Sequence, residues 1–224
     1  METVQLIALT MGVAWASGIN LYATIAMLGI LGGTGNLDLP PGLEVLQHPG
    51  VIVAAGFMYC VEFFADKVPG VDTGWDTLHT FIRIPAAAIL AAGAVGEVNP
   101  AIVLMAGILG GTLAATSHTL KAGTRVLINA SPEPFSNIGI SVAEDTLVLA
   151  GLAGAVFYPT EFLVFMALFI ALSIWLLPKI WRGVKFLFAR IRRVFQGGPQ
   201  PEPPSGISLK RIPAHHGSHV EGGA

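Results

Sequence analysis

Apolar stretches separated by short polar segments run through most of the chain, and this pattern predicts an all-α membrane protein. About 20 consecutive apolar residues cross a bilayer as a helix. Six stretches approach or exceed this length, at residues 4–31, 51–66, 78–95, 99–120, 138–158 and 160–177. We therefore predict a polytopic helical bundle of about six transmembrane helices over residues 1–178. Ser17, Gly18 and Asn20 interrupt the first stretch, where the helix is expected to kink or unwind, although Asn20 can equally hydrogen-bond a neighbouring helix.

A cut near residue 98 divides the six predicted spans into two groups of three. In each group the first span contains a serine, Ser17 or Ser117, and the second span contains acids. Groups with an odd number of spans have opposite orientations in the membrane, an arrangement that is common among transporters. Two inverted three-helix halves are therefore one prediction. The alternative is a chance likeness between two three-helix groups, because the sequence similarity is weak.

The pattern changes at residue 179, after the last apolar stretch. Between residues 179 and 195, large apolar side chains share one side of a helical wheel, and Lys or Arg share the other. A basic amphipathic helix of this kind is interfacial: it lies on the membrane surface and binds anionic lipids. Residues 196–224 consist largely of Gly, Pro, Ser and His, which predicts a disordered cytoplasmic tail.

The composition supports the membrane assignment. Hydrophobic residues make up 53% of the 224 residues, and the mean hydropathy is +0.69, whereas a soluble domain needs more polar surface. No Lys or Arg precedes the first apolar stretch, so a cleaved signal peptide is not expected. The single cysteine, Cys60, permits neither an intramolecular disulfide nor a cysteine metal cluster.

The positions of the basic residues predict the topology. All 12 Lys and Arg residues fall in or next to the second and fourth connections between spans or after the sixth span, with Arg83 near the start of the third span. Cytoplasmic loops of membrane proteins carry such an excess of Lys and Arg. With six spans, this distribution places both termini in the cytoplasm of a bacterial inner membrane.

Charged residues concentrate in two places, although only 12% of the chain is charged. Residues 62–83 carry two sets of acids at helical spacing, on either side of a break at Pro69 and Gly70. Residues 118–125 carry a basic face, and two acids follow at residues 144 and 145. Such residues in membrane helices are typical of sites that handle ions or polar solutes. The candidate binding residues are Asn20, Glu62, Asp66, Asp72, Asp76, His79, Arg83, His118, Lys121, Arg125, Glu144 and Asp145.

The two charged regions are expected to meet at the cytoplasmic end of the bundle. We predict that Asp66, Asp72 or Asp76 lies close to Lys121 or Arg125, because both regions occupy the same depth and each presents a single helix face. Glu144 is expected to lie deeper and to be less paired. Purely structural salt bridges would also neutralise the buried charge, without any function.

Several chemistries remain open for these residues. Carboxylates with His79 or His118 suit a divalent cation or a proton relay, so metal binding is not decided. Lys121 and Arg125 suit a phosphate or carboxylate group. The chain contains no Walker loop, HExxH, GxSxG or CxxC motif, so neither an enzyme nor a cofactor is expected.

The leading hypothesis is a small transporter or permease for an ion or a small polar solute. A homo-oligomer is possible because six short spans enclose little volume, and no nucleic-acid partner is expected. The alternatives are a membrane scaffold or assembly factor and an intramembrane enzyme that acts on lipid headgroups. In the enzyme, His79 or His118 would serve as acid or base.

Four motifs also carry a resemblance to a known family. They are ASGINLY at residues 16–22, the charged stretch at 62–83, the segment from Ser117 to Arg125 with SPEPFSN after it, and the pair Glu144–Asp145. In these motifs the chain resembles bacterial multi-pass membrane proteins that are known only as a domain of unknown function. The resemblance covers roughly residues 1–180. It implies a polytopic membrane protein, but it supplies no activity and no residue roles.

Overall fold

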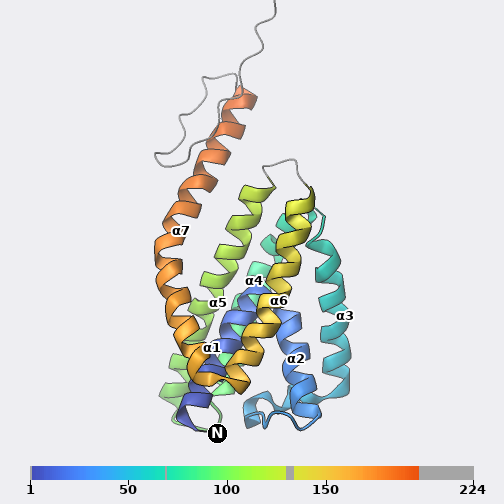
Figure 1. Cartoon of the computed structure of the whole chain (residues 1–224), viewed down its shortest axis with the longest axis vertical. Helices are drawn as coiled ribbons and strands as arrows, with labels where there is room; N and C mark the ends of the chain where they lie inside the picture. Colours follow the sequence, from blue (N-terminus) through green and yellow to red (C-terminus); the bar gives the residue numbers. More distant parts are fainter. Residues whose placement is uncertain (1, 69, 130–133, 197–224) are drawn as a thin grey trace, which may run out of the picture.

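The computed structural model describes residues 2–68, 70–129 and 134–196. Within these ranges every regular element is a helix, which confirms the all-α prediction (Figure 1). In chain order the elements are α1 (Thr3–Ile19), α2 (Leu21–Gly33), the 3₁₀-helix η1 (Pro41–Gln47), α3 (Pro49–Ala65), α4 (Val71–Ala94), α5 (Pro100–Ile128), α6 (Pro134–Phe157) and α7 (Pro159–Gln196).

The number of membrane spans differs from the six predicted. Four helices of the described chain, α4 to α7, are long and apolar enough to cross a bilayer. Helices η1 and α3, which meet at an angle of 72°, make a fifth candidate if the pair is counted as one broken span. Large apolar side chains such as Phe57, Phe81 and Ile174 are exposed on these helices. An apolar outer surface of this kind faces lipid, so the protein is an integral membrane protein.

The missing span is the first apolar stretch, which Asn20 divides into α1 and α2. These helices have 17 and 13 residues, which is short for a crossing. Asn20 leaves the helical conformation (φ −145°, ψ 98°), and its side-chain oxygen accepts the backbone N–H of Ala23 at 2.9 Å. Asn20 therefore caps the start of α2, and the chain reverses at the cap.

The helices α1 and α2 consequently form a hairpin that enters the bundle and returns to the same end (Figure 1). The following helices then alternate in direction. As a result, the start of α1 and the end of α7 lie at opposite ends of the bundle (Figure 1), whereas six crossings would place both termini at the same end. The hairpin also has no counterpart in the second group of helices, because α5 continues unbroken over 29 residues.

Helix α1 lies at the centre of the bundle, where it contacts α4, α5, α6 and α7. Near the C-terminal end of α1 the Trp15 ring is fully buried and meets the rings of Phe162, Phe165 and Phe169 of α7 edge-on. Still closer to this end, Gly18 lies against Ser117 and the α5 backbone, where a Cβ atom would clash. This close approach brings the end of α1 to the polar face of α5.

The segment predicted as a separate interfacial helix is continuous with the last span. α7 has 38 residues, contains Pro178 without ending there, and projects beyond the rest of the bundle (Figure 1). The predicted tail at residues 196–224 lies outside the described residues, except for Gln196.

Candidate functional site

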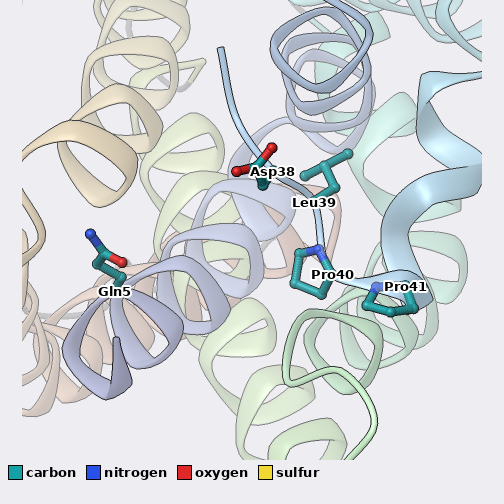
Figure 2. A pocket seen from close by; sticks show the side chains of 5 residues that line it. All are labelled: Gln5, Asp38, Leu39, Pro40 and Pro41. Carbon is teal, nitrogen blue, oxygen red and sulfur yellow. The ribbon is translucent and has the colours of Figure 1, made fainter. Parts of the chain in front are cut away.

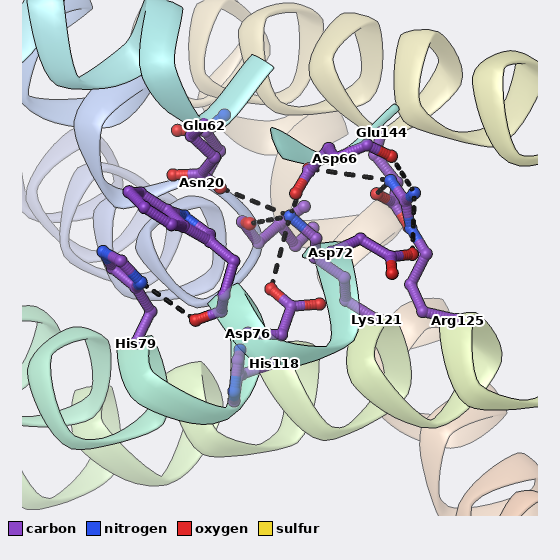
Figure 3. Close-up of polar contacts among 12 residues, drawn as sticks. Asn20, Glu62, Asp66, Asp72, Asp76, His79, His118, Lys121, Arg125 and Glu144 are labelled. Carbon is purple, nitrogen blue, oxygen red and sulfur yellow. Dashed lines mark hydrogen bonds and ion pairs between the residues drawn. The ribbon is translucent and has the colours of Figure 1, made fainter. Parts of the chain in front are cut away.

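The twelve predicted residues come together inside the bundle, and we refer to them as the charged cluster. Figure 3 labels all of them except Arg83 and Asp145. They come from the α1–α2 break and from α3, α4, α5 and α6. All except Glu144 are buried. The turn between α3 and α4 folds the two acidic sets of residues 62–83 towards each other. Gly70 (φ 88°) makes this turn, and its N–H donates to Asp72 Oδ1 at 2.9 Å.

Lys121 lies at the centre of the charged cluster. Its Nζ atom lies 2.8 Å from Asp66, 3.3 Å from Glu62 and 3.7 Å from Asp76. It also donates to the backbone oxygen of Ile19 at 3.1 Å. Because Ile19 ends α1, its carbonyl lies at the negative end of the helix dipole and favours a cation.

Arg83 is the deepest cation of the cluster. It lies 12 residues after Val71, the first residue of α4, and so about 18 Å along a helix that is long and apolar enough to cross a bilayer. The guanidinium is fully buried, pairs with Glu62, and lies 3.0 Å from Asp76. A lone arginine at this depth would be unstable in the membrane, and the two carboxylates offset that cost.

Arg125 joins three acids near the end of α5. Its Nη2 atom lies 2.6 Å from Glu144 and 3.6 Å from Asp66, and its Nη1 atom lies 3.7 Å from Asp72. Together with Lys121, these contacts confirm the predicted meeting of the acids of residues 66–76 with the basic face of α5.

The prediction for Glu144 was wrong. Glu144 makes a close ion pair with Arg125, and its side chain is 17% exposed, more than any other ion-paired side chain of the cluster. The weakly paired acid is its neighbour Asp145, which accepts a hydrogen bond from Asn20 Nδ2 at 3.1 Å and forms no ion pair within the described part of the chain. Consecutive helical residues point about 100° apart, so only one of the two can face Arg125.

The hydrogen bonds of the two histidines fix their tautomers. Thr80 donates its hydroxyl proton to the backbone of Asp76, so His118 Nε2 must donate to the Thr80 oxygen, at 2.7 Å. His118 Nδ1 then faces Arg83 as an acceptor. His79 Nδ1 donates to the Trp75 carbonyl at 2.9 Å, and its Nε2 atom lies 3.1 Å from the Tyr22 hydroxyl. His118 is therefore neutral beside two cations.

Negative groups outnumber positive ones in the charged cluster. Its six acids face only three permanent cations, Arg83, Lys121 and Arg125. Four carboxylate oxygens are buried without a hydrogen-bond donor in the described part of the chain: Glu62 Oε2, Asp66 Oδ1, Asp76 Oδ2 and Asp145 Oδ2. Since buried acceptors almost always have a partner, these oxygens are suited to bind a proton, water or a small cation.

The geometry does not support the predicted alternative of a divalent metal. Among residues 2–68, 70–129 and 134–196, no three His, Cys, Asp or Glu side chains are grouped as a metal site requires. The reason is that the carboxylates are arranged around Lys and Arg nitrogens.

Lys67, in the connection between α3 and α4, lies apart from these ion pairs. Its Nζ atom donates to the Phe63 carbonyl at 3.0 Å and lies 2.8 Å from the centre of the Phe63 ring. Partial burial lowers the pKa of Lys67, and the nearby Asp145 counteracts this shift.

Sequence reasoning missed several polar residues that support the cluster. Asn129 donates to both carboxylate oxygens of Asp72, at 2.9 Å each. It lies four residues after Arg125, so extending the basic face by one turn would have found it. Thr80 follows Asp76 by the same interval. Tyr22 gave no such signal, because its role depends on the reversal of the chain at Asn20.

One cavity borders the charged cluster, and another lies at the opposite end of the bundle. A pocket of about 480 Å³ at the other end of the bundle is lined by Gln5, Asp38, Leu39, Pro40 and Pro41 (Figure 2). A groove of about 570 Å³ between α5 and α7 is mainly apolar, but Thr80 and His118 also line it. The groove therefore reaches the edge of the charged cluster from the membrane-facing side.

A family model described as a domain of unknown function (DUF4126) matches residues 7–179. The match includes all four motifs on which the resemblance to an uncharacterised membrane family rests, and it confirms that resemblance. No curated protein and no solved structure matches the chain.

Proposed function

The chain belongs to the DUF4126 family, whose description assigns no activity, and we propose a function from the site itself: a small inner-membrane transporter or permease for an ion or a small polar solute. The cargo binds at the charged cluster. The observation that carries this proposal is the excess of six acids, all but Glu144 buried, over three permanent cations.

The excess separates a binding site from a purely structural network. Salt bridges that only hold helices together are expected to balance, because each uncompensated buried charge costs several kcal/mol. A proton or a small cation offsets the same cost when it binds. The unpartnered oxygens of Glu62, Asp66 and Asp76 supply acceptors for it. The cargo, or an ion coupled to it, is therefore positively charged.

The α1–α2 hairpin provides a means of access from the opposite side. Broken helices whose ends meet at a polar site near the middle of the membrane are typical of secondary transporters. Between the charged cluster and the pocket at Gln5 and Asp38 lies an apolar core that includes Leu9, Leu28 and Leu43. This core closes the route, and a movement of the hairpin would open it.

The orientation follows from the basic residues of α7. The exposed end of α7 carries Lys179, Arg182 and Lys185, which favours the cytoplasm and contact with anionic lipids. The charged cluster then lies towards the cytoplasm, and the start of α1 faces the periplasm. In a Cys60→Ala background, Glu2→Cys and Asp38→Cys should both react with an impermeant thiol reagent in intact spheroplasts. If Glu2→Cys did not react while Asp38→Cys did, the start of α1 would face the cytoplasm, and α1 with α2 would make a sixth crossing.

A flux screen in proteoliposomes tests the proposed function. The screen covers gradients of protons, alkali cations, and small organic cations and anions. The wild type should carry at least one of them, and Asp76→Asn should reduce the flux at least tenfold. Glu161→Gln changes an exposed acid in the first turn of α7, outside both the charged cluster and the pocket. It is the matched control and should retain full flux. No flux of any of these solutes by the folded wild type would contradict the proposal.

The groove between α5 and α7 supports a second candidate function, an enzyme acting on lipid headgroups. His118 is the only ionisable side chain of this groove in the described residues, and a histidine can act as an acid or base. Incubation of the purified protein with inner-membrane lipids would then yield a product that His118→Gln does not form.

A further inference from the structure

Asp145 differs from the other five acids of the charged cluster. Each of the others lies within 4.0 Å of an Arg or Lys nitrogen, whereas Asp145 has no such partner among the described residues. Only Asn20 Nδ2 donates to it, at Oδ1. The side chain is buried, with 7% of the residue exposed, and Oδ2 has no donor in the part of the chain that the structure describes.

We propose that Asp145 is the proton-binding group of the transport cycle, and that its protonation loosens the junction between α1 and α2. This inference rests on the proposed function and names its coupling ion. One proton from water binds Oδ2 when the site faces one side of the membrane, and the same proton leaves to the other side. The step forms and breaks only the O–H bond.

A proton fits this position better than a metal ion does. A hard cation needs several oxygen ligands, and the described side chains include no such group. A proton needs one carboxylate oxygen and an acceptor for the resulting hydroxyl. Ser141, one turn earlier on α6, shares the face of Asp145, and its buried hydroxyl has no partner among the described residues.

The charges around Asp145 permit both states. The ionisable groups that act on it are Lys121 from α5, Glu62 and Asp66 from α3, and Lys67 from the connection after α3. Tyr59 of α3 lies nearby as a neutral phenol. The α1–α2 break contributes only the Asn20 amide. Two anions and two cations thus act on this carboxyl, so the neighbouring charges by themselves enforce neither form.

Asn20 couples the protonation of Asp145 to a movement of the α1–α2 hairpin. Its side-chain oxygen caps α2 through Ala23, and its amide nitrogen donates to Asp145. A hydrogen bond to a carboxylate is about twice as strong as one to a neutral group. Protonation of Asp145 therefore weakens the contact that ties the hairpin tip to α6, and the hairpin can shift relative to the bundle.

Infrared difference spectroscopy tests this inference directly. The protein is prepared in lipid with ¹³C-carboxyl aspartate, and spectra are recorded as the pH is lowered. The wild type and Asp72→Asn should show a protonated-carboxyl band that Asp145→Asn lacks. A full band in Asp145→Asn overturns the inference. If Asp145→Asn does not fold, Asn20→Ala provides the test. The protonated-carboxyl band of Asn20→Ala should persist to a higher pH than that of the wild type. The same pH dependence in both proteins overturns the inference.

Proton flux separates this inference from the proposed function. Vesicles with an internal pH dye should report proton movement during cargo flux by the wild type and none in Asp145→Asn. Cargo flux without proton movement would overturn the inference and leave the transporter in place. An Asp145 band without any flux would support proton binding and contradict the transporter.

Discussion

The bundle has two regions with opposite environments, an apolar half and a charged half, which meet near the C-terminal end of α1. Around Leu9, Val13 and Trp15 the neighbours are apolar or aromatic and the helix is held by packing. Around Gly18, Ile19 and Asn20 the polar neighbours are Ser117, Lys121 and Asp145. Packing is non-directional and stabilises the bundle, whereas buried ion pairs contribute little net stability for the charge they contain. We therefore expect the apolar half to contribute most of the net stability and the charged half to contain the proposed transport site.

Removal of Arg83 should give the largest loss of stability. Arg83→Met leaves Glu62 and Asp76 without their main partner and should cost about 5 kcal/mol of unfolding free energy, because it creates uncompensated buried charge. Equilibrium unfolding in mixed micelles measures the loss. The double variant with Glu62→Gln should recover much of it. Without such recovery, Arg83 would act through packing and the contrast between the halves would fail.

Removal of Trp15 tests the apolar half. Trp15→Ala removes a fully buried ring that contacts three phenylalanines of α7, and it should cost about 3–4 kcal/mol. Trp15→Phe keeps much of the packing and serves as the control, with a loss of about half that size. Both variants should retain the solute specificity of the wild type in the flux assay. A change of specificity would place Trp15 in the functional half.

Asp72 should show an intermediate effect. Asp72→Asn weakens two hydrogen bonds from Asn129 and a 3.7 Å ion pair with Arg125, so we expect a loss of about 2 kcal/mol. Asn129→Ala removes the same hydrogen bonds from the other side. The two losses should therefore not add in the double variant, and full additivity would show that the residues act independently.

Helical spacing predicted the content of the charged cluster because its side chains follow simple rules. Residues four apart share a helix face, so the positions of Asp72 and Asp76, and of Lys121 and Arg125, indicated which groups meet. The same rule did not show which of Glu144 and Asp145 pairs with Arg125, since that depends on how α6 is rotated about its axis. Hydropathy likewise predicted that residues 4–31 enter the membrane, and polar residues 17–20 marked the interruption.

What hydropathy could not give is the direction of the chain after Asn20. A kinked span and a re-entrant hairpin have the same apolar content, and the difference depends on one capping side chain. That difference removes a crossing and separates the two termini. The length of α7 was also missed, because Pro178 and the basic residues after it mark a change of environment rather than the end of a helix.

Substitution of Asp145 should give the smallest change in the free energy of unfolding, and the sharpest contrast between an effect on stability and an effect on proton movement. Asp145→Asn keeps the shape of the side chain and an oxygen that can accept from Asn20, and it breaks no ion pair among the described residues. We therefore expect a change below about 1 kcal/mol in the same unfolding assay. If Asp145 were a structural anchor for the hairpin, its loss would approach that of Asp72→Asn. A stable Asp145→Asn variant without proton movement would instead show that the charged half contains an acid that is retained for function, since the fold does not need its charge.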